Sequence, residues 1–146
     1  MKKMGLLVGM CLLVLTGFAQ TSDSWSEFAK TKFEPKYYEK LGEYLFVPKF
    51  SDQLKSLVGK EITVQGYYVP FAPEGDSYIV ISKFPMSQCF FCGGAGPESI
   101  AEVNFLKSAP KFQVDDLITV KGKLKLNTDD VDHVNFILTE AVLVSK

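Results

Sequence analysis

The sequence contains no arginine, because all 16 of its basic residues are lysines. Arginine is the residue that most often makes paired hydrogen bonds to phosphates, carboxylates and guanine bases. The chain is also slightly acidic, with 17 Asp and Glu residues. An acidic chain without arginine lacks the basic surface on which nucleic-acid binding depends, so we predict no nucleic-acid partner.

Histidine is almost absent as well, since His133 is the only one. General acid–base catalysis would therefore fall to carboxylates, and the sequence sets no acidic pair in an apolar frame. It also lacks a Ser-His-Asp grouping, a Walker loop and a dinucleotide-binding fingerprint. These absences favour a binding protein over an enzyme.

No apolar run reaches the length of about 20 residues that a membrane span needs. The longest run, Leu6–Leu15, follows Lys2 and Lys3 and precedes Gly17 and Ala19, which is the order of parts in a secretory signal peptide. We therefore predict a signal peptide at residues 1–19, cleavage near Ala19, a periplasmic location and no retained membrane span.

Cleavage would remove Cys11 together with two lysines, which lowers the lysine count from 16 to 14 against 17 acidic residues, a formal charge of −3. Residues 20–146 are then enough for one domain with a substantial core. Export places the remaining cysteines in an oxidising compartment, where a neighbouring pair can form a disulfide.

Residues 20–56 are predicted to be a lead-in of two helical segments and one strand. Apolar residues at helical spacing follow Ser24, a suitable N-cap, and Pro35 would end this helix. A strand at Tyr44–Val47 would end at Pro48, and one or two helical turns over 51–58 would follow. The residues at helical spacing in the first segment are Trp25, Phe28, Ala29 and Phe33, and Ser51 is the N-cap of the second.

Residues 57–146 read as a run of strands with apolar and polar residues in alternation. Gly66 and Gly122 each lie in the middle of a long strand, where glycine permits the bend or bulge that a small closed barrel requires. The pattern predicts a mainly β fold, a five-stranded OB-like barrel with a short N-terminal helical segment. Residues 106–116, interrupted by Pro110, are too short and irregular for the helix that OB folds often carry there. The predicted strands cover residues 61–70, 77–84, 101–105, 117–126 and 134–144.

The segment Gly66-Tyr67-Tyr68-Val69-Pro70, followed by a cysteine loop, resembles an uncharacterised family of exported, OB-like proteins of Gram-negative bacteria. Members carry a Gly-Tyr-x-x-Pro first strand, a second strand and a cysteine-bearing loop rich in Pro or Gly. The resemblance covers roughly residues 57–144. Some members have a His-Pro-rich loop after the cysteine, which implies metal binding, whereas this chain has Cys-Phe-Phe-Cys-Gly-Gly.

The cysteine loop, defined as residues 85–98, holds the most distinctive chemistry of the sequence. Cys89 and Cys92 have the spacing of a chelating pair for a soft metal such as Cu or Zn, and His133 would be the third ligand. The same pair could instead form a structural disulfide or cycle as a thiol–disulfide redox centre. Residues that would support the site are Met86, Gly93, Gly94 and Glu98, with Phe90 and Phe91 inserted into the barrel end. The glycines would allow positive φ angles or close packing, and Pro97 suits the first position of a single helical turn.

Two weaker patterns are interpreted as scaffold. The acidic turn after residue 128 lacks the glycine and distal glutamate of a calcium loop, so we interpret it as a solvated turn. Aromatic residues of the first two strands could form a stacking platform, but without arginine or positive charge we expect them to pack against the barrel. These residues are Asp129, Asp130 and Asp132 in the turn, and Tyr67, Tyr68, Phe71 and Tyr78 on the strands.

The sequence thus predicts a periplasmic binding module of unknown ligand, whose cysteine loop holds a soft metal ion or docks another envelope protein. Two alternatives stay open. One is a thiol–disulfide redox protein, and the other is a purely structural interaction domain of the cell envelope.

Overall fold

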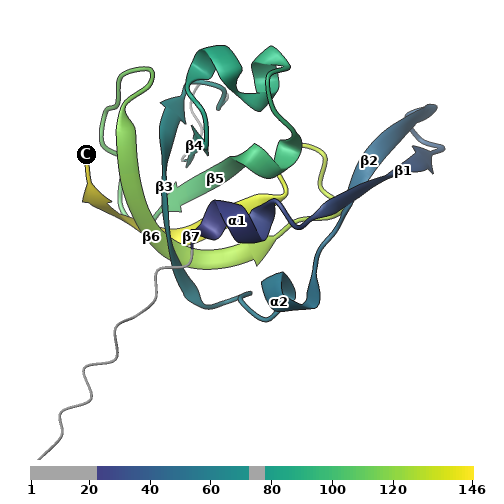
Figure 1. The fold of residues 1–146 in the computed structure, drawn as a ribbon, viewed down its shortest axis with the longest axis horizontal. Helices are drawn as coiled ribbons and strands as arrows, with labels where there is room; N and C mark the ends of the chain where they lie inside the picture. Colours follow the sequence, from purple (N-terminus) through teal and green to yellow (C-terminus); the bar gives the residue numbers. More distant parts are fainter. Residues whose placement is uncertain (1–22, 73–77) are drawn as a thin grey trace, which may run out of the picture.

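The computed structural model describes residues 23–72 and 78–146 (Figure 1). The predicted signal peptide and its cleavage point near Ala19 lie outside these ranges. Within them, no helix has both the length and the apolar character needed to cross a membrane.

Five strands form a closed barrel, which confirms the predicted fold class. Around the barrel the order is β3-β4-β5-β7-β6, with β6 pairing back to β3. Strands β5 and β7 run parallel and the other neighbours run antiparallel, an arrangement consistent with an OB-like barrel. The strands are β3 (Glu61–Val69), β4 (Tyr78–Ser82), β5 (Ile100–Phe105), β6 (Leu117–Leu126) and β7 (Phe136–Ser145).

The two mid-strand glycines serve different purposes in this barrel. A Cβ atom on Gly66 would lie 2.8 Å from the carbonyl oxygen of Ser82 and 3.2 Å from the ring of Trp25. Gly66 therefore allows an aromatic ring to press against the strand. At Gly122 the register between β6 and β7 shifts, and a Cβ atom would lie 3.0 Å from the carbonyl oxygen of Thr139. The bulge expected from a mid-strand glycine is thus found at Gly122.

Helix α1 (Ser24–Phe28) lies across the barrel and contributes to its core (Figure 1). The ring of Phe28 stacks on that of Phe136 at 4.2 Å, and both side chains are fully buried. The indole Nε1 of Trp25 donates a 2.6 Å hydrogen bond to the carbonyl oxygen of Gln65. The N-terminal lead-in and the barrel therefore share one hydrophobic core.

The sequence prediction for the first helix was too long. Asp23, not Ser24, is the N-cap, because its carboxylate accepts the backbone N–H of Trp25. The helix ends after Phe28, and Phe33 belongs to a strand. Helical spacing of Phe33 was coincidental, since strand pairing with residues further along the chain determines its conformation.

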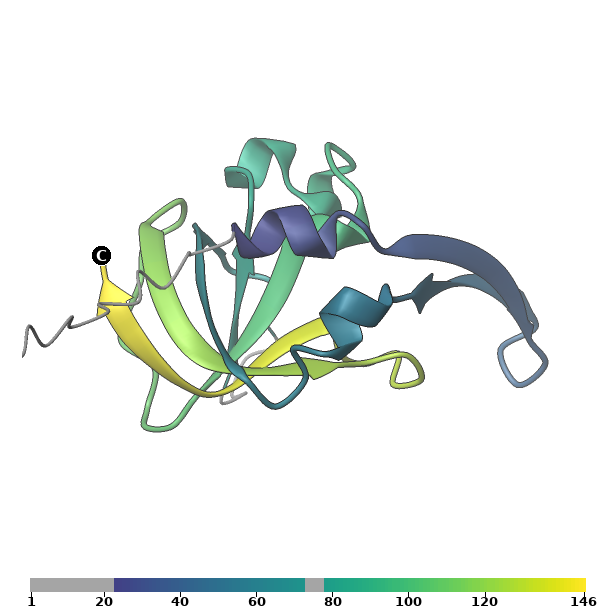
Figure 2. The same cartoon turned by 60° about the horizontal axis from the view of Figure 1, so that its bottom comes forward.

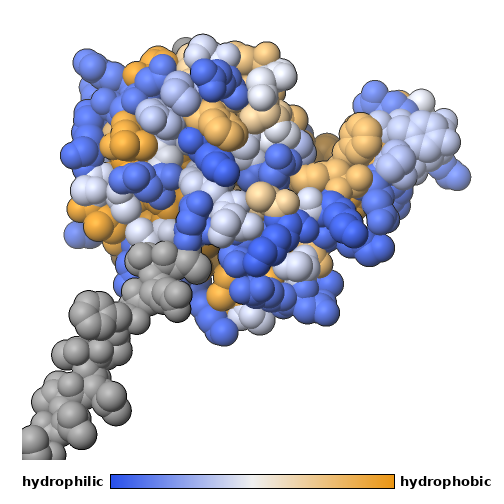
Figure 3. Space-filling model, viewed as in Figure 1, coloured by the Kyte–Doolittle hydropathy of each residue, from blue (hydrophilic) through white to orange (hydrophobic). Residues whose placement is uncertain are grey.

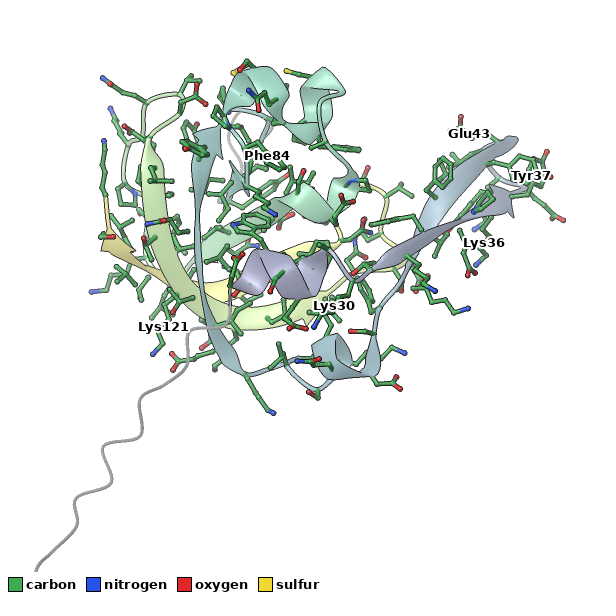
Figure 4. The ribbon with its side chains drawn as sticks, in the orientation of Figure 1. Lys30, Lys36, Tyr37, Glu43, Phe84 and Lys121 are labelled. Carbon is green, nitrogen blue, oxygen red and sulfur yellow. The ribbon has the colours of Figure 1, made fainter. Side chains whose placement is uncertain are left out.

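A β-hairpin of strands β1 (Lys32–Tyr38) and β2 (Glu43–Lys49) projects away from the barrel (Figures 1 and 2). It contains the strand predicted at Tyr44–Val47, but its partner β1 was not predicted. Pro35 and Pro48 lie inside these strands. Each strand of a two-stranded ribbon has one unpaired edge, and there a proline, which has no backbone N–H, can lie without breaking a ladder hydrogen bond. Figure 4 shows Tyr37 and Glu43 at the far end of the hairpin.

Two shorter predictions are confirmed. Helix α2 (Asp52–Lys55) begins after Ser51, whose hydroxyl accepts the backbone N–H of Leu54 at 3.1 Å. Residues 106–116 form no helix, and Phe112 of this segment instead contacts the rings of Tyr68 and Phe105.

Candidate functional site

The cysteine loop folds into three short 3₁₀ turns, of which the last confirms the single turn predicted after Pro97. They are η1 (Met86–Gln88), η2 (Phe90–Cys92) and η3 (Pro97–Ser99). Gly93 ends the second turn with φ +76°, a left-handed conformation that favours glycine. A Cβ atom on Gly94 would lie 2.7 Å from the carbonyl oxygen of Gln88, so no larger residue fits there. Both glycines thus have the roles predicted for them.

Cys89 anchors this loop on the barrel wall. Its side chain is fully buried in a small second core with Val69, Val80 and Ile100. The prediction that Phe90 and Phe91 insert into the barrel end is therefore wrong, because these two side chains are 37% and 41% exposed. Of these three residues, only the smaller Cys89 side chain is buried, and it packs in the second core on the outside of the barrel wall.

The structure brings the two cysteines together as free thiols, with Cys89 buried and Cys92 exposed. The two thiols lie close enough to influence each other's ionisation. Partial desolvation and then this contact with Cys89 raise the pKa of Cys92 above its ordinary value. A raised thiol pKa keeps Cys92 protonated at neutral pH, which is the opposite of what an attacking redox thiolate requires.

His133 is not placed with the cysteines. Its Nδ1 atom lies 2.8 Å from Oε2 of Glu102 on strand β5. Throughout the described ranges, no three His, Cys, Asp or Glu side chains gather closely enough to hold a metal ion. The metal-ligand set Cys89, Cys92 and His133 is therefore not assembled by the fold, because His133 is held by a different partner.

The other residues predicted to support a site serve the loop itself. Met86 contacts the second core around Cys89, and its backbone N–H donates to the Asp115 carboxylate at 2.6 Å. The Glu98 carboxylate lies against Gly96. Among the described residues, Glu98 is not gathered with two further Cys, His, Asp or Glu side chains.

A cavity of about 740 Å³ lies over the outer face of β4 and β5, and we call it the β4–β5 cavity. Its floor is made by alternate residues of the two strands, whose intervening neighbours point into the barrel core. The hairpin, the cysteine loop and the β6–β7 loop surround it. The floor residues are Tyr78, Val80, Ile100 and Glu102.

Aromatic side chains form the walls of the β4–β5 cavity. Phe71 stacks on Phe91 with ring centroids 4.2 Å apart, and Phe90 meets Phe91 edge-on at 5.5 Å. From the other side the hairpin contributes Phe33 and Phe46. Hydrophobic surface is visible where the hairpin joins the barrel (Figure 3). The two Phe residues between the cysteines thus shape this cavity.

The polar part of the β4–β5 cavity is the pair of His133 and Glu102. The Glu102 side chain is 2% exposed, whereas that of His133 is 38% exposed. Asn104 donates to Oε1 of Glu102 at 2.7 Å, so both carboxylate oxygens have partners. The hydrogen bond and the charge of Glu102 raise the pKa of His133. Because Nδ1 faces Glu102, Nε2 is the ring nitrogen left for a ligand.

Asn127 holds the acidic turn beside this cavity. Its Oδ1 accepts the backbone N–H of Asp130 at 3.0 Å, and its amide donates to the carbonyl oxygen of Asp130 at 2.7 Å. Asp130 and Asp132 are exposed and line the cavity, whereas Asp129 does not. The turn is solvated, as predicted, and it also supplies charge to the site.

Sequence reasoning missed most of this site. Glu102 carried a signal, an acidic residue within the apolar run Ile-Ala-Glu-Val of β5, but nothing local indicates its partner. Of the proposed stacking platform, Phe71 and Tyr78 do line the cavity, while Tyr68 contacts Phe112. Tyr78 also packs against the second core, as expected, so packing on the barrel and lining the cavity are combined in this residue.

Comparisons of the chain with protein families, with curated proteins and with solved structures found no match. The resemblance to exported OB-like proteins stays a prediction. The fold and the β4–β5 cavity therefore carry the functional argument.

Proposed function

We propose that this protein is a binding module that holds a small ligand with an apolar body in the β4–β5 cavity. One observation carries the proposal: the cavity lies over the second and third barrel strands, which is the face that OB folds use for ligands. Its volume of about 740 Å³ falls in the range of small-molecule sites. Aromatic walls with a few convergent polar groups are also typical of such sites.

The cysteine loop has a supporting role in this proposal. The buried Cys89 fixes the loop, and the left-handed turn at Gly93 ends the segment that presents Phe90 and Phe91 to the cavity. A thiol–disulfide redox function has less support, because the pKa of Cys92 is raised and Cys89 is inaccessible. The signal-peptide pattern of residues 1–19 supports a periplasmic location.

Titration with Nile red, a neutral dye that fluoresces in apolar sites, tests this proposal. Phe46→Ala removes a cavity wall, and Tyr44→Ala is the matched control, because Tyr44 is on the same strand with 69% exposure against 70% for Phe46 but does not line the cavity. We expect Phe46→Ala to weaken dye binding about fivefold, from the loss of partly buried aromatic area, and Tyr44→Ala to change it less than about twofold. Absence of dye binding, or equal effects of the two variants, would refute the proposal.

A further inference from the structure

The lining groups of the β4–β5 cavity that can carry charge near neutral pH are predominantly acidic. They are the carboxylates of Glu102, Asp130 and Asp132 and the imidazole of His133. No lysine is among the described residues that line the cavity. With His133 protonated or neutral, these groups therefore carry a net negative charge.

Among the described residues, no lysine neutralises the two exposed carboxylates of the cavity, Asp130 and Asp132, by an ion pair. Oδ1 of Asp130 accepts the backbone N–H of Asp132 at 3.1 Å, which orients the turn but leaves its charge in place. A bound cation would meet uncompensated negative charge at the mouth of the cavity.

The aromatic walls of the β4–β5 cavity also suit a cationic ligand. Ring faces of phenylalanine and tyrosine attract cations through their quadrupoles, and rings of Phe71, Phe91 and Tyr78 line this cavity. Aromatic walls also accept the apolar body that would accompany the charge. Resting on the function proposed above, we propose that the ligand of the β4–β5 cavity is an organic cation, an amine or quaternary ammonium group on an apolar body.

His133 makes this binding depend on pH. The charged groups that act on its ring are Glu102 and Asp130, which favour the imidazolium, and Lys125, which disfavours it, while Tyr78 packs against the ring at 5.6 Å. Below the pKa of His133, the imidazolium compensates Glu102. Above it, the cavity gains one unit of negative charge, so cation affinity rises as the pH passes through that pKa.

Three probes with one phenylbutyl body separate the effect of charge from that of shape: 4-phenylbutylamine, 4-phenylbutan-1-ol and 4-phenylbutyrate. We expect isothermal titration at pH 8 to give about tenfold tighter binding of the amine than of the alcohol, and the weakest binding for the carboxylate. Carboxylate binding as tight as amine binding would overturn the inference, since His133 would then be the anchor.

Variants of the acidic turn test the residues directly. The double variant Asp130→Asn/Asp132→Asn is expected to weaken amine binding about fivefold while alcohol binding changes less than about twofold. Asp129→Asn is the matched control, because Asp129 is an exposed acid of the same turn that does not line the cavity. An equal loss for the alcohol, or for Asp129→Asn, would overturn the inference.

The outcomes separate this inference from the proposed function. If Nile red binds but the three probes show no preference for the amine, the β4–β5 cavity is a ligand site and the cation inference is wrong. If Nile red does not bind either, the proposed function fails and the inference fails with it.

Discussion

The Nδ1 atom of His133 lies 2.8 Å from Oε2 of Glu102, a carboxylate that is only 2% exposed. We expect the pKa of His133 to lie above the ordinary value of about 6.5, because this hydrogen bond and this charge favour the imidazolium. The chain has a single histidine, so an NMR titration of its imidazole signal is unambiguous. In Glu102→Gln the pKa should fall towards the ordinary value, and an unchanged pKa would contradict the pairing.

The same pair predicts a pH-dependent stability. A histidine pKa that is higher in the folded than in the unfolded state stabilises the fold fully below the unfolded pKa and loses this effect as the pH rises through the folded pKa. The free energy of unfolding, measured in urea, should therefore favour the wild type over Glu102→Gln by a pH-dependent amount that is largest below about pH 6.5. We expect it to be at most about 1 kcal/mol, since His133 is partly exposed and screened by solvent. A difference that grows with pH would have the wrong sign.

Phe28 tests whether the N-terminal helix belongs to the barrel core. Phe28→Ala should lower the free energy of unfolding by about 3–5 kcal/mol, because this fully buried ring stacks on Phe136. Phe46→Ala deletes the same ring at a site that is 70% exposed, and should cost less than about 1 kcal/mol. Equal losses in chemical denaturation would show that the helix is not integrated into the core.

Gly66 tests the close approach of Ser82 and Trp25 to strand β3. A methyl group there would meet the carbonyl oxygen of Ser82 at 2.8 Å, so Gly66→Ala should destabilise the protein by about 1–3 kcal/mol. Gly96→Ala is the control, because its methyl group would meet only the carboxylate end of the flexible Glu98 side chain. Thermal denaturation of the two variants should differ clearly, and a harmless Gly66→Ala would contradict the packing.

The two thiols should differ sharply in reactivity. In a Cys11→Ser background, iodoacetamide should modify the exposed Cys92 and leave the buried Cys89 untouched until denaturant is added, as judged by mass spectrometry. Because the pKa of Cys92 is raised, its alkylation rate should continue to increase above the ordinary thiol pKa of about 8.5. Rapid modification at pH 6–7 would instead support a redox role.

The sequence by itself determined the closed barrel and the turns that shape its loop. Alternation of apolar and polar residues along each strand is local information, and Val64 and Gly66, which it puts on one face of β3, are both buried. The left-handed turn at Gly93 and the cap at Ser51 were likewise predicted, because each depends on the chemistry of a few adjacent residues. The predictions at two prolines were wrong, because Pro35 and Pro48 were interpreted as the ends of a helix and a strand but lie within the strands of the hairpin.

Only the tertiary structure decided where a ligand would bind. The β4–β5 cavity joins residues from the hairpin, the cysteine loop, strand β5 and the β6–β7 loop, which are far apart in the chain. Its central pair links Glu102 to His133 across 31 positions, and no local pattern specifies such a partner. No local pattern places His133 relative to the cysteines either. Their residue types suggested a common metal site, but in the folded barrel His133 is paired with Glu102 instead. The sequence specifies the chemistry of each side chain, whereas the convergence of side chains from distant segments depends on the tertiary fold of the whole chain.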